Sequence, residues 1–151
     1  MKIALAADHA GFDLKNHLKA WAQERGFEVL DLGAFNTEPS DYPDFAQAAG
    51  QAVLSKSAER AILICGSGVG ASVAANKLPG IRAGLCHDSY SARQDVAKDA
   101  MNVLVLGARV IGSALAEDLV DNFLHASFTN EERHRRRLRK ISEMEQRASN
   151  Q

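Results

Sequence analysis

The sequence predicts an α/β fold, a doubly wound five-stranded parallel sheet of the Rossmann type. Short apolar runs alternate along the chain with longer segments of helical periodicity, which is typical of parallel strands joined by right-handed helical crossovers. A glycine-rich loop follows the third run, and strand–loop–helix units of this kind bind anions. We expect strands at 2–7, 27–32, 61–65, 81–86 and 102–106, and helices at 12–25, 44–55, from 71 onward, 89–99, 113–125 and 129–147.

The composition is that of an ordinary globular domain. The 151 residues are 46% hydrophobic and 25% charged, which leaves room for one core of ordinary size. A net charge of −1 gives no general attraction to nucleic acid or to anionic membranes. No apolar run approaches the ~18 residues of a membrane span, no basic leader precedes one, and the two cysteines form no CxxC pair. We therefore expect a soluble cytoplasmic protein without a disulfide framework or a zinc site.

The first apolar run ends in Asp8 and His9. Ligands of open α/β sheets gather at the carboxyl ends of the strands, so both side chains are candidate binding residues. Two structural explanations compete: Asp8 could cap the next helix, and His9 could be a solvated turn residue. Apolar residues at helical spacing, closed by a glycine, indicate that helix. They are Phe12, Leu14, Leu18 and Trp21, followed by Gly26.

The second run leads into a polar loop that ends at Asp41, Tyr42 and Pro43. Proline suits the first position of a helix, so a helix is expected to begin here. Asp41 could simply cap it. The helix that follows is rich in alanine and glutamine.

The third run ends in Cys65 and is followed by the glycine loop. Loop amides and the positive end of the next helix converge on one point, and such a helix end also stabilises a thiolate. Two structural explanations remain: Cys65 could be an ordinary buried cysteine, and the glycines could form a tight turn without a ligand. Dinucleotide binding is a third alternative, since Gly66, Gly68 and Ala71 fit its loose fingerprint. Asp88 lies after the next strand, near the expected distance.

The fourth and fifth runs also place polar residues at strand ends. His87 and Asp88 follow the fourth run, and Arg109 follows the fifth. In open α/β sheets these positions lie where ligands bind. We interpret Cys86 as a packed thiol, not a reactive one.

The segment 127–151 is predicted to be a helical arm added to the domain at 1–126. Its many arginines allow nucleic-acid binding, but acidic residues interrupt the run and no aromatic residues are interleaved. A solvated charged face is the structural explanation. Arg133 and Arg137 share a helical face with room for a phosphate. An apolar stripe has no place in a finished α/β domain, so we expect the arm to pack on another subunit. The stripe consists of Leu138, Ile141 and Met144.

Eight short motifs occur along the chain in a fixed order. They are Asp8-His9-Ala10-Gly11, Asp41-Tyr42-Pro43, Cys65-Gly66-Ser67-Gly68-Val69-Gly70, Ala74-Ala75-Asn76-Lys77, Gly80-Ile81-Arg82-Ala83, Tyr90-Ser91-Ala92, Asn102-Val103-Leu104 and Gly107-Ala108-Arg109. Together they resemble the type B ribose-5-phosphate isomerases and the related galactose-6-phosphate isomerase subunits. The resemblance extends from Met1 to about Ile141, and it argues against the dinucleotide interpretation.

The resemblance implies an aldose–ketose isomerase of phosphosugars that needs no metal or cofactor. It also implies a homodimer or homotetramer with shared active sites. By similarity, Cys65 is the base that moves a proton between C1 and C2, and Ala71 stands where another branch carries a glutamate base. Ser67 and the loop amides would hold the enediolate oxygens. The implied substrate-binding residues are Asp8, His9, Tyr42, Gly66, Gly68, Val69, Gly70, Asp99 and Arg109, with Arg133, His134 and Arg137 arriving from the neighbouring subunit.

One pair of residues departs from the family pattern. The family has His-Asn before the Asn-Val-Leu strand, and the histidine opens the furanose ring; here the pair is Lys98 and Asp99. Lys98 thus occupies the catalytic position, and His87 is an alternative for ring opening. Ribose 5-phosphate and ribulose 5-phosphate, a pair of the pentose phosphate pathway, are the default substrates. A tetrose or other open-chain phosphosugar, or a non-catalytic sugar-phosphate-binding protein, is the alternative.

Overall fold

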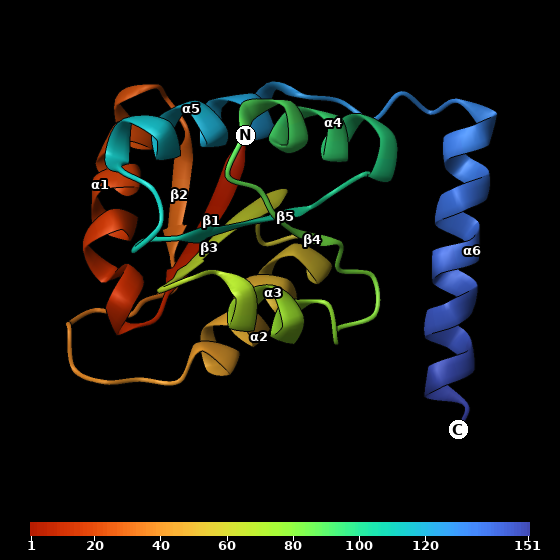
Figure 1. Cartoon of the computed structure of the whole chain (residues 1–151), viewed down its shortest axis with the longest axis horizontal. Coiled ribbons are helices and arrows are strands. Elements are labelled where there is room, and N and C mark those ends of the chain that lie inside the picture. The colour runs from red at the N-terminus through yellow and green to blue at the C-terminus, as the bar shows by residue number, and fades with distance from the viewer.

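The chain folds around a five-stranded parallel sheet (Figure 1). The computed structural model describes residues 1–151, and the strands lie in the order β2-β1-β3-β5-β4. All neighbouring pairs run parallel, so the doubly wound parallel sheet predicted from the sequence is confirmed. The strands are β1 (Lys2–Ala7), β2 (Glu28–Asp31), β3 (Arg60–Cys65), β4 (Ala83–Leu85) and β5 (Val103–Gly107).

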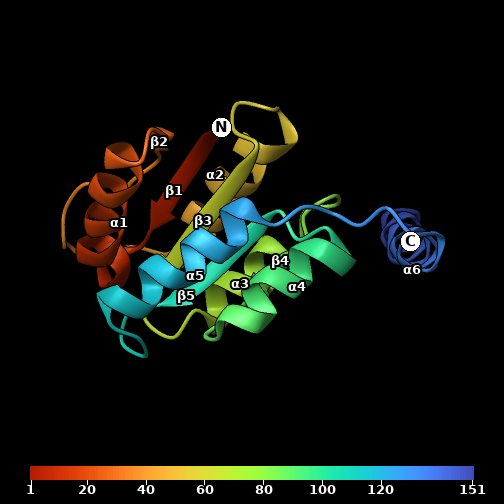
Figure 2. The same cartoon turned by 90° about the horizontal axis from the view of Figure 1, so that it is seen from above.

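Helices cover both faces of the sheet, and the last helix stands apart (Figures 1 and 2). Side chains of α1, α4 and α5 pack on one face, and those of α2 and α3 pack on the other. No helix is both long enough and apolar enough to cross a membrane. The helices are α1 (Phe12–Glu24), preceded by the short turn η1 (His9–Gly11), α2 (Tyr42–Leu54), α3 (Val69–Ala75), α4 (Ser89–Asp99), α5 (Ser113–His125) and α6 (Glu132–Ser149).

The strand β3 sends alternate side chains to the two faces of the sheet. Ile64 packs among the side chains of α1, α4 and α5, whereas Leu63 and Cys65 face α2 and α3. The α2–α3 face is built mainly from small residues, which lets these helices approach closely; a Cβ on Gly50 would lie 2.3 Å from Leu78. This close packing brings the first turn of α2 beside the loop that follows β3.

Several element ends differ by one to three residues from the sequence expectation, and two of these differences have a clear physical reason. The fourth strand is shorter than 81–86 because the Arg82 N–H donates to the side-chain oxygen of Asn102 at 2.8 Å. It is also an edge strand, paired with β5 alone. The last helix begins after Asn130 instead of at 129, since Asn130 has a left-handed backbone (φ 59°) that an α-helix does not contain.

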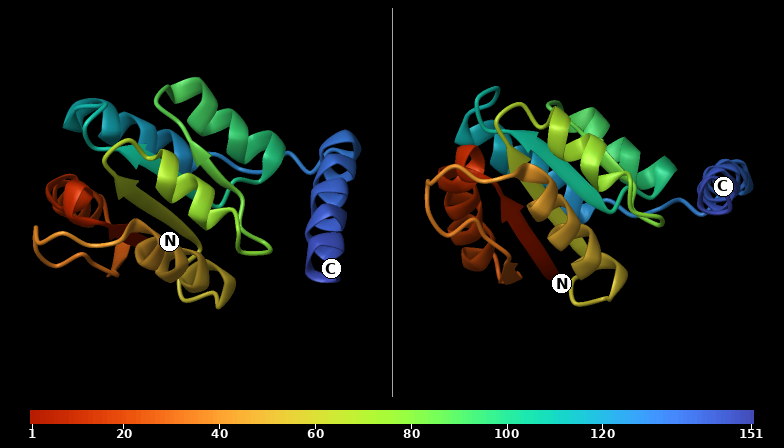
Figure 3. Two further views of the ribbon diagram at one scale, coloured as in Figure 1. Left: turned by 60° about the horizontal axis from the view of Figure 1, so that its bottom comes forward. Right: turned by 90° about the horizontal axis from the view of Figure 1, so that it is seen from below.

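The helix α6 forms an arm at one side of the molecule (Figures 1 and 3). Its lead-in is tied to α4, where the Thr129 N–H donates to the Ala97 carbonyl at 2.9 Å. The His134 ring is only 2% exposed and bonds to the Thr129 hydroxyl at 2.5 Å. Further along, the Glu145 carboxylate accepts the Gly80 N–H at 3.1 and 3.2 Å. The division between domain and arm drawn from the sequence stays a prediction.

A fully buried lysine supports the end of β2. Lys15 is 0% exposed, and its ammonium donates to the Asp31 carboxylate at 2.7 Å. Asp31 also accepts hydrogen bonds from the Gly33 N–H at 3.0 Å and from Lys19 at 3.2 Å. Burial alone would raise the pKa of Asp31, but these hydrogen bonds outweigh it and lower the pKa. The pair therefore couples α1 to the start of the loop after β2.

We expect Asp31→Asn to lower the free energy of unfolding by about 3 kcal/mol at pH 7, because it leaves the buried ammonium of Lys15 without its counter-charge. Since the folded-state pKa of Asp31 is lowered, its contribution is complete above the unfolded value of about 4 and is lost as the pH falls below it. Urea unfolding of both chains from pH 7 to pH 3 measures this. Glu28→Gln, in an exposed pair, is the control and should change stability by less than about 1 kcal/mol. An equal effect of the two substitutions would contradict the prediction.

Candidate active site

The candidate site lies at the carboxyl ends of β1, β3 and β5. From β1 the chain continues to β2 at one edge of the sheet, and from β3 it continues toward β4 at the other edge. This change of direction makes the end of β1 and β3 the topological switch point, where open α/β sheets bind their ligands. Asp8 follows β1, Cys65 ends β3, and Arg109 follows β5. The strand-end residues predicted from the sequence therefore share one edge.

The Cys65 thiol faces the glycine loop. The residue is 4% exposed, and its Sγ accepts the Gly68 N–H at 3.2 Å. The Ser67 side chain is exposed, and its hydroxyl accepts the Val69 N–H at 3.2 Å. A hydrogen bond from an amide favours the charged form of its acceptor. Cys65 is thus a buried strand cysteine, as one alternative expected, and its sulfur is hydrogen-bonded to the Gly68 amide of the glycine loop.

The loop glycines have packing reasons of their own. Gly68 has a left-handed backbone (φ 83°), and a Cβ there would lie 3.1 Å from the carbonyl carbon of Leu106. A Cβ on Gly70 would lie 2.6 Å from the ring of Tyr42. The loop therefore lies flat against β5 on one side and against the start of α2 on the other. The glycines are therefore explained by the tight turn, and the exposed amides of the loop can still bind a ligand.

Arg109 lies directly over the loop. The backbone N–H of Arg109 donates to the Gly66 carbonyl at 3.0 Å. The side-chain Nη1 is 3.3 Å from the position that a Cβ on Gly66 would occupy. The guanidinium is exposed and pairs with no carboxylate of the chain. A free, forked cation beside an amide-lined loop is suited to bind a phosphate.

Asp8, His9 and Tyr42 complete this edge. Asp8 is 6% exposed and caps the turn η1, since its Oδ1 accepts the N–H groups of Ala10 and Gly11 at 3.0 and 3.2 Å. The capping alternative is therefore correct for Asp8, with both hydrogen bonds on one oxygen. His9 is not a freely solvated turn residue, because it exchanges two hydrogen bonds with the loop before α2. Tyr42 is 40% exposed and starts α2 earlier than the expected 44.

Other predicted site residues lie away from this edge. Lys98 and Asp99 end α4, which runs back from the carboxyl edge toward the start of β5. Arg133 and Arg137 are in the first turns of α6, which stands on the side where β5 begins (Figure 1). The chain therefore does not bring Lys98 or Asp99 to its own Cys65. Because α4 runs away from the carboxyl edge, its last turn lies at the other side of the sheet from Cys65.

His134 lies at the base of the arm. The resemblance assigns it to a neighbour's phosphate site; in this chain its ring is buried and bonded to Thr129. It anchors the arm beside the end of α4 and has no free face toward solvent. The helical pattern of arginines around it gave no signal of this burial.

The dinucleotide interpretation does not fit the topology. Asp88 caps α4 by accepting the Ser91 N–H at 2.7 Å. It follows β4, and β5 lies between β4 and the strand that carries the glycine loop. In dinucleotide-binding sheets the acidic residue ends the strand next to that loop. Asp88 is thus one strand too far away.

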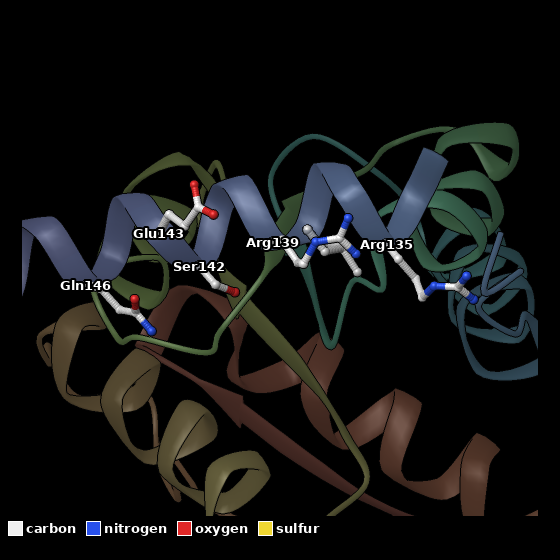
Figure 4. A pocket seen from close by; sticks show the side chains of 6 residues that line it. Arg135, Arg139, Ser142, Glu143 and Gln146 are labelled. Carbon is white, nitrogen blue, oxygen red and sulfur yellow. The ribbon is translucent and has the colours of Figure 1, made fainter. Parts of the chain in front are cut away.

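Beyond the Cys65 edge, the chain offers few ligand-capable groupings. No three or more His, Cys, Asp or Glu side chains gather in a way that could hold a metal ion. One hollow lies along α6 and is lined from that helix alone (Figure 4). It is an uncovered helix face, not an enclosed cavity. Its residues are Arg135, Leu138, Arg139, Ser142, Glu143 and Gln146.

Two side chains near the site were missed or undervalued from the sequence. Ser40 bonds to His9, although they are far apart in the chain. His87 accepts the Gly107 N–H through Nε2 at 3.0 Å, and Gly107 is the strand partner of Cys65. The only sequence signal for Ser40 was a polar residue before the Asp-Tyr-Pro motif.

The comparisons with known proteins show an α/β enzyme of the sugar-phosphate aldose–ketose isomerase class. The chain belongs to the ribose/galactose isomerase family, whose model matches residues 3–141. Ribose-5-phosphate isomerase B of Escherichia coli K12 is 44% identical over 146 residues, which are 97% of each chain. D-erythrulose-4-phosphate isomerase of Pectobacterium atrosepticum is 41% identical over 129 residues, or 85% of each. The solved structure of Clostridium thermocellum ribose-5-phosphate isomerase B has a TM-score of 0.96 at 45% identity, covering 98% of this chain and 99% of that one. The resemblance drawn from the motifs is confirmed.

Proposed function

We propose that this enzyme interconverts ribose 5-phosphate and ribulose 5-phosphate through an enediolate, with Cys65 as the base. The observation that carries the proposal is the Cys65 sulfur at the end of β3, 3.2 Å from the Gly68 amide nitrogen. Proton transfer between C1 and C2 needs one positioned base and donors aimed at the developing oxyanion. The names of two similar proteins, both ribose-5-phosphate isomerase B, support the choice of substrate.

The chemistry moves one proton from C2 to C1 and a second from the C2 hydroxyl to the oxygen on C1, and no bond between heavy atoms breaks. The Cys65 thiolate removes the proton from C2 of the open-chain aldose, and the pair of electrons shifts onto the carbonyl oxygen. Amides of the loop and the Ser67 hydroxyl would donate to the enediolate oxygens, as preorganised donors do at other oxyanions. The thiol then returns its proton to C1, the C2 hydroxyl loses its proton as it becomes the ketone, and the oxygen on C1 takes up a proton to become a hydroxyl.

The groups around the thiol would hold the rest of the sugar. Asp8, His9 and Tyr42 stand at the same edge and offer an acceptor, an imidazole and a phenol to sugar hydroxyls. Arg109 would bind the phosphate, whose distance from the reacting carbons lets binding energy orient them. We further propose a homodimer or homotetramer in which Arg133 and Arg137 of one chain complete the phosphate site of another.

A second candidate substrate is a tetrose phosphate, favoured by Lys98 and Asp99. Ribose 5-phosphate exists mainly as a closed furanose, whereas a tetrose 4-phosphate cannot form that ring. A lysine is a far weaker acid than the histidine that the family uses for ring opening. One similar protein is named D-erythrulose-4-phosphate isomerase, which supports this alternative.

We expect Lys98→His to raise kcat/KM for ribose 5-phosphate by about tenfold and to change that for erythrose 4-phosphate little, because only the first substrate needs a ring-opening acid. Proton exchange at C2 measured by NMR in D₂O with both sugars tests the proposed function and this prediction together. Lys56→His, at an exposed position before β3, is the matched control.

Two results would go against the prediction. If the wild type isomerises ribose 5-phosphate rapidly and Lys98→His slows it, another group opens the ring, and His87 is the first to replace. If no phosphosugar exchanges a proton although ribose 5-phosphate binds, the chain is a non-catalytic binding protein.

A further inference from the structure

We propose that Ser40 is a positioning residue that fixes the orientation and the tautomer of His9. The inference rests on the proposed function in one respect, that His9 meets the substrate. The hydrogen bonds that carry it belong to the fold itself. Nothing in the motifs assigns a role to Ser40.

Ser40 and His9 form a reciprocal pair of hydrogen bonds between distant parts of the chain. The backbone N–H of His9 donates to the Ser40 hydroxyl oxygen at 3.1 Å. In return, the Ser40 N–H donates to Nδ1 of the His9 ring at 3.1 Å. Backbone and side chain of each residue are both engaged, so the ring has little freedom to turn.

The second bond selects one form of the imidazole. An amide N–H can donate only to a ring nitrogen that carries a lone pair, so Nδ1 is the unprotonated nitrogen of the neutral ring. The proton then resides on Nε2, and the ring offers a donor at its free end. A sugar hydroxyl or a phosphate oxygen, each an acceptor, is the kind of group that this end recognises.

The loop that carries Ser40 is fixed at both ends, and between them the Phe35 ring lies 5.3 Å from the Lys15 ammonium. At its start the Ala7 N–H donates to the Gly33 carbonyl at 2.7 Å, and the Ala34 N–H donates to the Ala7 carbonyl at 2.6 Å. At its other end α2 begins at Tyr42. The residues 35–39 are all exposed. The Ser40 hydroxyl therefore provides a hydrogen bond that ties the end of this exposed stretch to the site and keeps the Ser40 amide aligned with Nδ1.

The test uses ¹⁵N NMR of the imidazoles in the full-length chain, with the His9 signal assigned by its loss in His9→Gln. In the wild type, Nε2 should resonate as the protonated nitrogen and Nδ1 as the unprotonated one. In Ser40→Ala the two shifts should move toward each other as the tautomers exchange. Ser40→Thr, which keeps the hydroxyl, should restore the wild-type pattern. Thr37→Ala, in the exposed part of the same loop, is the matched control.

Activity separates this inference from the proposed function. With ribose 5-phosphate, Ser40→Ala should raise KM about fivefold, the effect of one hydrogen bond, and change kcat less. Unchanged ¹⁵N shifts in a folded Ser40→Ala chain would overturn the inference whatever the activity. Altered shifts with unchanged KM would uphold Ser40 as the positioning residue and remove His9 from the proposed substrate site.

Discussion

Replacing Cys65 with alanine should lower kcat at least about 100-fold and abolish exchange of the substrate C2 proton with solvent. A positioned general base contributes 10²–10⁴-fold, and no other thiol or carboxylate ends β3 at the glycine loop. Binding of ribose 5-phosphate should stay within several-fold, because the loop amides and Arg109 are unchanged. Exchange followed by NMR in D₂O and binding followed by calorimetry measure the two effects separately.

The other cysteine of the chain provides the matched control. Cys86 is buried and donates to the Asp95 carboxylate at 3.3 Å. Burial, with a smaller contribution from nearby Asp95, raises the pKa of Cys86 to about 12, so it is a thiol at neutral pH. Cys86→Ala should keep its activity and lose about 1 kcal/mol of stability. Retention of more than a tenth of wild-type activity by Cys65→Ala would refute the base assignment.

The central strands were predictable because they are buried on both faces. β1, β3 and β5 have almost no exposed side chain, and their continuous apolar runs gave their positions to within a residue. The edge strand β4 was predicted too long, since its start depends on a hydrogen bond between Arg82 and Asn102 that no local pattern reveals. The apolar pattern thus predicts whether a segment is a strand or a helix, whereas individual polar contacts decide where it begins and ends.

The site was predictable only where it follows the strand ends. Cys65 and Arg109 fall together because parallel strands end at one edge. The pair of His9 and Ser40 depends on how a long loop folds back, which short-range patterns do not determine. Lys98 was assigned to the active site by its position in the family motif. Such a match does not say whether the residue acts in the site of its own chain or in that of a neighbouring chain. Its place in the last turn of α4, away from Cys65, emerges only from the direction of the helix.

The second prediction with a large effect on activity concerns active sites shared between subunits. Within one chain, Arg137 lies on the arm and Cys65 at the opposite edge of the sheet. Arg137 is exposed and pairs with no carboxylate, whereas Arg135 and Arg139 both contact Glu132. The hollow face of α6 is lined by its own residues alone, so it is open to a second chain (Figure 4). If both groups act on one phosphosugar, they come from two subunits.

We therefore expect Cys65→Ala and Arg137→Ala chains to be nearly inactive alone and to recover activity when mixed. In a mixed dimer one of two sites receives intact Cys65 from one chain and intact Arg137 from the other. Random mixing puts half of the chains in such dimers, so about a quarter of wild-type activity should return. Cys65→Ala mixed with Arg109→Ala is the matched control, because both residues stand at the same edge of one chain and no intact site can form. Mass spectrometry verifies the mixed dimers. No recovery of activity in verified dimers of the first pair would mean that Arg137 serves its own chain or no site at all. Recovery in the control would mean that Cys65 and Arg109 of one chain do not act in the same site.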